Sequence, residues 1–324
     1  MPPDEAAAPA TPTIAAPVLR IGLYAAAGRP EFTGPAGLTV RDPDEGVLWS
    51  VAPGETVQAV ADGDLIVLRS GNRSLRRRTI LLAPDDSLGS VLVDGKAYRG
   101  DIELRRGSDG VQVINTVDLE AYLIAVVGAE MGRRTPEEMA ALEAQAVAAR
   151  TYAIRNLERH AGEGFDLTAD IGSQVYRGVA AELPLAQLAV EATRGEILTY
   201  DGLPIDAFYS STCGGHTEAT EAVFSGGSRP YLTAHPDQAP DGTAWCAISP
   251  AYRWRQSWNG SEIAATLRRT LAAERLPTAR AGDLRVETGG IVADAATGRA
   301  DWQAWYTFSA SGRPVHNRVH SQFH

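Results

Sequence analysis

Residues 135–160 read TPEEMAALEAQAVAARTYAIRNLERH, and this stretch decides the fold class. Thr135 is a good N-cap, Pro136 suits the first helical position, and Glu138 completes a Thr-x-x-Glu capping box. The pattern predicts one long helix that ends near His160. Its inner face would consist of Met139, Leu142, Ala146, Ala149 and Ala153. Because that face is narrow and rich in alanine, the helix should pack closely against a neighbour.

Further helices and a hairpin are predicted on both sides of this helix. Asp118 can cap a short helix over residues 119–127, which Gly128 would end. Another helix is expected over about 185–193. Residues 196–200 and 204–209 should then form a hairpin through Asp201-Gly202, a favoured two-residue turn.

The N-terminal side has the character of a β-structure. Short alternating runs predict strands at 18–24, 56–61, 65–69, 79–82, 91–93 and 111–114, separated by clusters of Gly, Pro and Asp. Residues 1–17 are rich in Ala and Pro and indicate a linker. The predicted fold class is α+β, with a β-rich part (18–114) packed on a mixed helix and strand core (115–260).

The C-terminal side of the core is less regular. Residues 210–250 form a long polar, Gly-rich stretch, and connections of that kind are usually functional or disordered. A last segment, 261–324, should hold a helix at 261–275 and strands at 284–287 and 302–308. His316, His320 and His324 lie four apart and could form a metal-binding stripe on a helix. A frayed polar tail is the simpler interpretation.

Composition excludes several classes of protein. The chain has 324 residues and a formal net charge of -10, which argues against a protein that wraps nucleic acid. Its single lysine, Lys96, is not part of a Gly-Lys-Ser/Thr phosphate loop. None of the histidines begins a His-Glu-x-x-His zinc-protease motif. No run reaches eighteen apolar residues, so no membrane-spanning helix is predicted, and Met1–Pro17 lacks the pattern of a signal peptide.

Glu130 is the strongest candidate for acid–base chemistry. It is placed just past the predicted end of the 119–127 helix, in the run Val126-Val127-Gly128-Ala129-Glu130-Met131. A helix C-terminus and apolar neighbours both disfavour a charged carboxylate, and a general acid must keep its proton. A solvated surface glutamate is the competing interpretation.

A second candidate segment is Phe208-Tyr209-Ser210-Ser211-Thr212-Cys213-Gly214-Gly215-His216-Thr217-Glu218. Its paired glycines would let backbone approach a ligand, or simply form a tight turn. A serine hydrolase would need a base beside Ser210 or Ser211, and His216 is near in sequence. However, the Gly-x-Ser-x-Gly elbow is not present, so this interpretation ranks far below the others.

Together these segments resemble the stage II sporulation protein D and amidase-enhancer family. The similar blocks begin with Asp118-Leu119-Glu120-x-Tyr122-Leu123 and Ala129-Glu130-Met131. They continue through residues 142–153, Gln174-Val175-Tyr176-x-Gly178, residues 208–218 and Pro230-Tyr231-Leu232. The family's C-terminal Gly-His-Gly-Val-Gly-Met-Ser-Gln run is not found in this sequence.

The resemblance implies a lytic transglycosylase acting on peptidoglycan glycan strands, with Glu130 as the catalytic residue. It further implies an extracytoplasmic location in the cell envelope. The alternative is a non-catalytic peptidoglycan-binding module that enhances a cell-wall amidase, an interpretation favoured by the missing C-terminal run. The expected glycan contacts or supports are Arg150, Tyr152, Gln174, Tyr176, Tyr209, Ser210, Ser211, Gly214, Gly215, Thr217 and Glu218.

The two cysteines leave three alternatives open. Cys213, His216, His235 and Cys246 offer thiolate and imidazole ligands that suit tetrahedral zinc, and the resemblance adds that some family members hold zinc in this region. A Cys213–Cys246 disulfide is the main rival in an exported protein. Two separate thiols are the third option. If zinc binds, it should be structural, and catalysis should need no cofactor.

Overall fold

The computed structural model describes residues 17–86, 89–108, 110–224, 227–253, 284–293 and 300–308. The chain divides into two compact units, residues 1–209 and residues 210–324. This boundary lies inside the predicted 115–260 core and leaves the β-rich part with the first half of that core. The 261–275 helix and the His316, His320 and His324 stripe lie outside the described residues.

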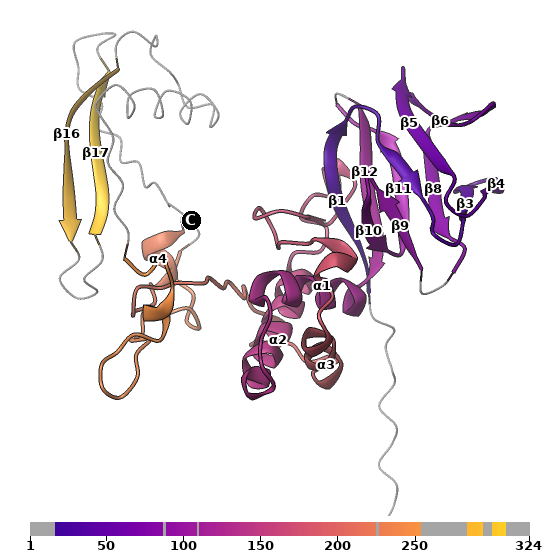
Figure 1. Ribbon diagram of the computed structural model, residues 1–324. Helices are drawn as coiled ribbons and strands as arrows, with labels where there is room; N and C mark the ends of the chain where they lie inside the picture. Colours follow the sequence, from indigo (N-terminus) through magenta and orange to yellow (C-terminus); the bar gives the residue numbers. More distant parts are fainter. Residues whose placement is uncertain are drawn as a thin grey trace, which may run out of the picture. The chain divides into compact units, whose positions relative to one another are not determined.

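The N-terminal part of the first unit consists of two sheets (Figure 1). The larger follows the order β13 (Leu167–Thr168), β1 (Val18–Ala27), β12 (Val111–Asp118), β11 (Asp101–Arg106), β8 (Thr79–Pro84), β3 (Leu38–Asp42) and β4 (Gly46–Val51). The smaller follows β10 (Lys96–Arg99), β9 (Ser90–Val93), β2 (Glu31–Thr33), β5 (Thr56–Asp62), β6 (Leu65–Ser70) and β7 (Arg73–Arg77). Neighbours are antiparallel except that β13 runs parallel to β1.

The two sheets share one apolar core. Ile66 and Leu68 of β6 are fully buried, as are Ile102 and Leu104 of β11 on the facing sheet. The strand predictions are confirmed, since every predicted segment lies in a strand. The α+β class with a β-rich N-terminal part is confirmed as well.

Helices follow directly from β12. Asp118 ends β12, and its carboxylate accepts from the Glu120 and Ala121 amides to start α1 (Leu119–Met131). The prediction that Gly128 ends this helix is wrong. Gly128 lies against the carbonyl oxygen of Ala181. Its missing side chain therefore lets α1 pack closely against the Ala181 backbone, and the helix continues past it. Gly132, with φ of 66°, is the C-cap.

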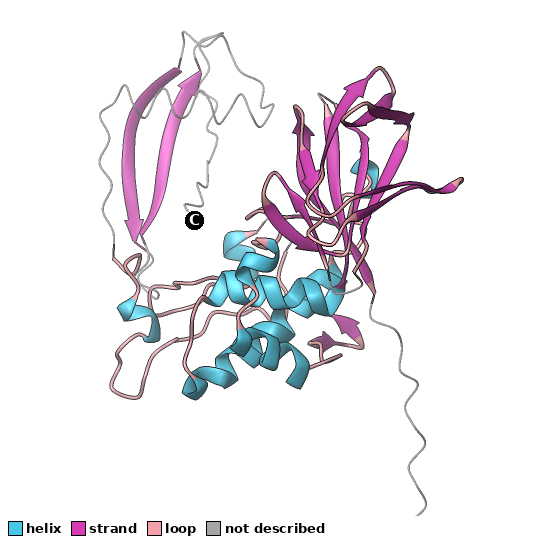
Figure 2. Cartoon of the chain, turned by 45° about the vertical axis from the view of Figure 1, so that its right-hand side comes forward, coloured by secondary structure: helices cyan, strands magenta, loops and turns pink. Residues whose placement is uncertain are grey.

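The long helix is confirmed in position but not in length. A 3-10 turn, η1 (Pro136–Glu138), precedes α2 (Met139–Arg155), and the Thr135–Glu138 capping box forms as predicted. The helix ends at Arg155 rather than near His160. At this end the Asn156 side chain donates to the Tyr152 carbonyl oxygen. The helices α1, α2 and α3 (Pro184–Ala192) pack together at one end of the sheets, as Figure 2 also shows.

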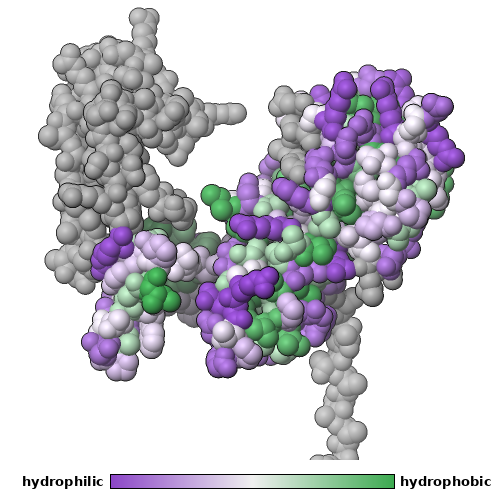
Figure 3. Space-filling model, in the orientation of Figure 1, coloured by the Kyte–Doolittle hydropathy of each residue, from purple (hydrophilic) through white to green (hydrophobic). Residues whose placement is uncertain are grey.

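Small connecting elements complete the first unit. The hairpin β14 (Thr199–Tyr200) and β15 (Leu203–Pro204) turns at Asp201 and Gly202, both with positive φ, as predicted. Its strands are shorter than expected because pairing stops at Pro204. On the face seen in Figure 3 the β-rich part is largely hydrophilic, and more hydrophobic surface lies over the helices.

The second unit has little regular structure among its described residues. It contains α4 (Thr220–Val223), the 3-10 turn η4 (Trp245–Ile248) and an antiparallel pair, β16 (Leu284–Ala293) and β17 (Ala300–Phe308). Both predicted C-terminal strands are thereby confirmed. Across the described parts of the chain, every helix is too short or too polar to cross a membrane.

Candidate active site

Glu130 lies in the last turn of α1, and its side chain is exposed. The expected position beyond the helix end, among apolar neighbours, is therefore wrong, because α1 continues past it. The Val175 amide donates to Glu130 Oε1 at 3.0 Å, and the Tyr209 hydroxyl forms a second hydrogen bond to the carboxylate. Two donors from distant segments thus fix the carboxylate at the surface.

A chain of buried polar groups lies beneath this carboxylate. The Tyr122 hydroxyl donates to Gln174 Oε1 at 3.2 Å, and Gln174 Nε2 donates to the Tyr209 hydroxyl at 3.0 Å. Gln174 Nε2 also lies 3.3 Å from the Ala149 carbonyl oxygen, which ties the chain to α2. The side-chain amide of Gln174 therefore sets the position of Tyr209, and Tyr209 contacts Glu130.

The two tyrosines of this hydrogen-bonded network, Tyr122 and Tyr209, keep their protons. Burial raises the pKa of the Tyr209 hydroxyl well above its ordinary value, and the Glu130 carboxylate adds to the rise. Burial likewise raises the pKa of Tyr122. At neutral pH both hydroxyls are therefore donors, which gives the network one direction, from Tyr122 through Gln174 and Tyr209 to Glu130.

Tyr176 connects the site to the sheets. Its ring lies between those of Tyr122 and Tyr98, with centroid separations of 4.9 and 5.7 Å. Its hydroxyl donates to Asn115 Oδ1 at 2.9 Å, and Asn115 in turn donates to the Arg99 carbonyl oxygen. The loop that carries Gln174 and Val175 is thereby held against the β-rich part.

Arg150 is buried in the helical layer and forms an ion pair with Glu120. Its Nη2 and Nε atoms lie 2.8 and 2.9 Å from the two Glu120 oxygens. The guanidinium also donates to the Val190 and Glu196 carbonyl oxygens and to Thr193 Oγ1. It therefore joins α1 and α2 to the end of α3.

Burial separates the expected glycan contacts into two groups. Arg150, Tyr152, Gln174 and Tyr176 are buried, so the structure favours supporting roles over direct contact with a ligand. Tyr209 is half-buried, and Ser210 and Ser211 are exposed at the start of the second unit.

The loop before Gln174 is fixed by Asp170. Its carboxylate accepts from the Thr168 hydroxyl at 2.8 Å and from the Gly172 amide at 2.9 Å. The Thr168 hydroxyl and the Gly172 amide lower the pKa of Asp170, so it remains an anion. These contacts give Asp170 a role in shaping the loop that presents Val175 to Glu130.

In the second unit the predicted loop residues form a compact turn. Gly214 and Gly215 both have positive φ, and Gly215 is buried, where a side chain would press on Ala244. The Thr217 amide donates to the His235 carbonyl oxygen at 2.8 Å, and Glu218 is half-buried. The predicted residues of this loop thus support a turn whose backbone is bonded to residues 235–237.

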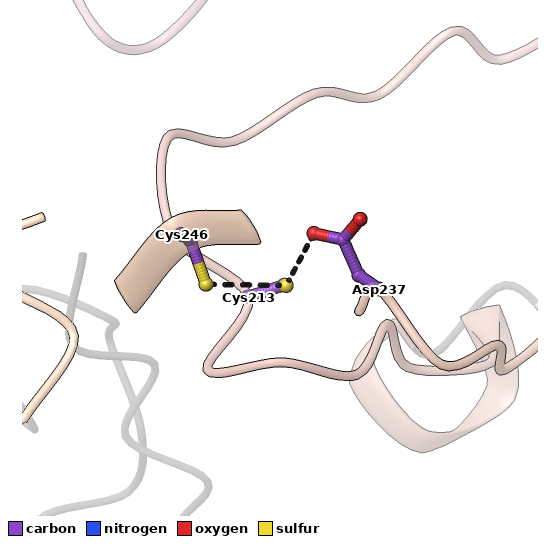
Figure 4. A group of neighbouring side chains, drawn as sticks. All are labelled: Cys213, Asp237 and Cys246. Atoms are coloured by element: carbon purple, nitrogen blue, oxygen red, sulfur yellow. Dashed lines mark hydrogen bonds between the residues drawn. The ribbon is translucent and has the colours of Figure 1, made fainter. Parts of the chain in front are cut away.

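The four predicted metal ligands do not all meet. Cys213 and Cys246 lie with their sulfurs 3.7 Å apart, and Asp237 Oδ2 is 3.0 Å from Cys213 Sγ (Figure 4). His216 Nδ1 instead donates to the Thr217 carbonyl oxygen at 2.7 Å, and His235 Nε2 is 2.7 Å from the Thr233 hydroxyl. The His216 contact also leaves the serine-hydrolase interpretation without the expected Ser–His bond.

Sequence comparison finds a similarity for the segment that carries most of this arrangement. Residues 107–200 match the family model described as stage II sporulation protein. This segment contains Glu130, Glu120, Arg150, Gln174 and Tyr176, that is, the helical layer and most of the polar chain beneath the carboxylate.

Individual relatives agree with the family match. Stage II sporulation protein D of Bacillus subtilis is 34% identical over 167 residues, which are 47% of this chain and 46% of the relative. The amidase enhancer of Bacillus subtilis is 41% identical over 105 residues, covering 32% of this chain and 14% of the relative. An uncharacterized protein of Brachyspira hyodysenteriae is 38% identical over 141 residues, or 43% of this chain and 38% of that protein.

Over these segments the chain is similar to stage II sporulation protein D and to the amidase enhancer. The matched segments span less than half the length of each of these relatives.

Three residues of these sites were missing from the predicted set. Glu120 and Tyr122 both lie in the 118–123 block, but only the fold reveals that Glu120 pairs with Arg150 and that Tyr122 donates to Gln174. Asp237 lies 24 positions after Cys213, and no short-range spacing signals the contact.

Proposed function

We propose that this protein is a lytic transglycosylase that cleaves peptidoglycan glycan strands at the cell envelope, with Glu130 as its acid and base. The observation that carries this proposal is the Glu130 carboxylate, exposed to solvent yet held by the Val175 amide and the Tyr209 hydroxyl. The relatives named for sporulation and for amidase enhancement support a role on the wall.

A single carboxylate is sufficient for this reaction. Glu130 in its protonated form would give its proton to the glycosidic oxygen between N-acetylmuramic acid and N-acetylglucosamine as that bond to C1 breaks. The C6 hydroxyl of the same muramic residue then attacks C1, and the Glu130 carboxylate accepts the hydroxyl proton. One C–O bond breaks, another forms, and no water is consumed, so the second carboxylate of ordinary glycosidases is not required.

The surroundings of Glu130 suit this double role. The C-terminal end of a helix carries partial negative charge, so a carboxylate formed there needs donors to offset it. The Val175 amide and the Tyr209 hydroxyl supply two, and the Gln174 amide keeps the Tyr209 hydroxyl turned toward Glu130. The carboxyl group is therefore oriented in both protonation states.

Product analysis tests the proposal. Purified glycan strands, with and without stem peptides, would be incubated with the wild type, with Glu130→Gln and with the control Glu143→Gln on α2, and analysed by mass spectrometry. Wild type and Glu143→Gln should both produce 1,6-anhydro ends, whereas Glu130→Gln should not. Cleavage that survives Glu130→Gln, or heavy oxygen incorporated from labelled water, would contradict the mechanism.

A second candidate function is a non-catalytic module that binds glycan and enhances a cell-wall amidase. The similarity of residues in this chain to the amidase enhancer favours it. Binding of wild type and Glu130→Gln to insoluble peptidoglycan, together with the rate of an added amidase, separates the two functions. Equal binding, no anhydro products and a faster amidase would establish the second function in place of the first.

A further inference from the structure

A cavity lies on the outer face of the smaller sheet, over the neighbouring strands β5 and β6 (Figure 1). Its volume is about 350 Å³. Most of its lining comes from these two strands, and one further residue comes from the segment that precedes β2. The side chains of the lining include Arg29, Gln58, Val60, Asp62, Val67 and Arg69.

Strand alternation places these side chains on the face away from the core. Gln58 stands opposite Arg69 and Val60 stands opposite Val67 in the pairing of β5 with β6. Ala59, between Gln58 and Val60, is fully buried in the core, and successive side chains of a strand point to opposite faces. Val67 is nevertheless only 5% exposed, so the two valines form a sheltered apolar floor.

The cavity carries positive charge that no carboxylate offsets. Among the residues that the structure describes, neither Arg29 nor Arg69 forms an ion pair. Asp62, the acidic residue of the lining, is paired with Arg76 of β7. In a chain with a formal net charge of -10, two unpaired guanidinium groups at one cavity favour an anionic ligand.

Gln58 adds a neutral hydrogen-bonding group. Its Nε2 atom donates to Glu31 Oε1 at 2.6 Å, which leaves its Oε1 atom to accept from a ligand N–H group. An inorganic anion would use the two arginines but neither this acceptor nor the apolar floor. The carboxyl end of a peptide would use all three, because it combines a carboxylate, an amide N–H and a side chain.

We propose that this cavity binds the carboxyl end of a short peptide. Arg29 and Arg69 hold the terminal carboxylate, and Gln58 Oε1 accepts the last amide N–H. The two valines contact a small apolar side chain. Stem peptides of peptidoglycan, which contain alanine and end in a carboxylate, have this chemistry. The choice of that source rests on the function proposed above, but binding here does not involve Glu130.

Titration of the full-length protein with N-acetyl-D-alanyl-D-alanine, followed by NMR of the backbone amides, tests the site. Saturable shifts should appear on β5 and β6. Arg29→Gln and Arg69→Gln should each weaken binding by at least about tenfold, since a hydrogen bond to a charged group has effects of that size. The matched control is Arg78→Gln, which removes the same charge from an exposed residue outside the cavity and should bind as wild type does.

An ester analogue isolates the Gln58 contact. N-acetyl-D-alanyl-D-lactate lacks the last N–H, so it should bind the wild type about three- to tenfold more weakly than the dipeptide, the effect of one neutral hydrogen bond. Gln58→Leu should bind the ester and the dipeptide alike. The dipeptide with an amidated C-terminus should bind at least about tenfold more weakly than the free acid, because it lacks the carboxylate.

Several outcomes would overturn the assignment. They are a wild type without saturable shifts, an equal loss of affinity in Arg78→Gln and Arg69→Gln, and inorganic phosphate that binds as tightly as the dipeptide. Wild type that binds ester and dipeptide alike would do the same. Preference for N-acetyl-L-alanyl-L-alanine would overturn the choice of a stem peptide. Glu130→Gln should bind the dipeptide as wild type does, so failure of the cleavage proposal can be told apart from failure of this one.

Discussion

The buried ion pair between Arg150 and Glu120 makes a strong prediction about stability. The side chain of Arg150 is 1% exposed and that of Glu120 is 5% exposed. Arg150→Met would leave the Glu120 carboxylate buried without its partner, and would remove a donor from the Val190 and Glu196 carbonyl oxygens. Breaking a buried pair in this way costs about 3–5 kcal/mol, so the free energy of unfolding should fall by that amount.

A matched control exists in the same unit. Arg76 pairs with Asp62 between β7 and the end of β5, but their side chains are 61% and 52% exposed. Because solvent screens such a pair, Arg76→Met should cost less than about 1 kcal/mol. The two substitutions are chemically identical, so the difference between them isolates the effect of burial.

Urea unfolding of the full chain, followed by far-ultraviolet circular dichroism, measures both changes. With a slope of about 2 kcal/mol per molar urea, Arg150→Met should lower the unfolding midpoint by about 2 M. Adding Glu120→Gln should recover part of this loss, because the stranded charge is then gone. A midpoint for Arg150→Met equal to that of Arg76→Met, at unchanged slope, would refute the reasoning.

Three further predictions concern the site and its support. Tyr209→Phe should slow glycan cleavage by about 10- to 100-fold, because a hydrogen bond to a charged group contributes about 1.5–3 kcal/mol. The rate is measured on purified strands, and an unchanged rate would remove Tyr209 from its positioning role. Gly128→Ala should lower the urea midpoint even though alanine favours helix by about 1 kcal/mol, because the methyl group meets the Ala181 carbonyl oxygen. Burial raises the pKa of Asp101 despite the opposing charge of Arg41, so its carboxylate costs stability above the folded-state pKa. Asp101→Asn should therefore raise the urea midpoint at pH 7, and the gain should disappear below about pH 3.5, where the carboxyl is protonated in both states.

Local chemistry explains which elements could be predicted from the sequence. The capping box at Thr135 and the Asp201-Gly202 turn depend on residues within four positions, and both form as predicted. The strand β7 escaped prediction because its arginine-rich sequence lacks an apolar face, and it lies at the edge of its sheet, paired with β6. Gly128 was misinterpreted for a similar reason, since its partner lies more than fifty residues away.

In the candidate site, too, features set by local sequence could be predicted and features set by distant contacts could not. Glu130 could be selected from its helix-end position and from the family resemblance. The exposure of its side chain could not, because it depends on how far α1 extends. Asp237 was missed because a contact across 24 residues is set by the paired backbone of the glycine loop, and not by spacing along the chain.

The burial of Arg150 and Gln174 changes what the family blocks mean in this chain. These polar side chains lie beneath the surface, so their hydrogen bonds determine the shape of the helical layer and the position of Tyr209. Of the hydrogen-bonded residues at the site, Glu130 has an exposed side chain and Tyr209 a half-exposed one. A substitution at Gln174 should therefore affect the rate of bond cleavage more than the affinity for glycan, because it would misplace the hydroxyl that contacts the carboxylate without removing a surface contact. The opposite result, weakened binding at an unchanged cleavage rate, would place Gln174 among the groups that touch the strand.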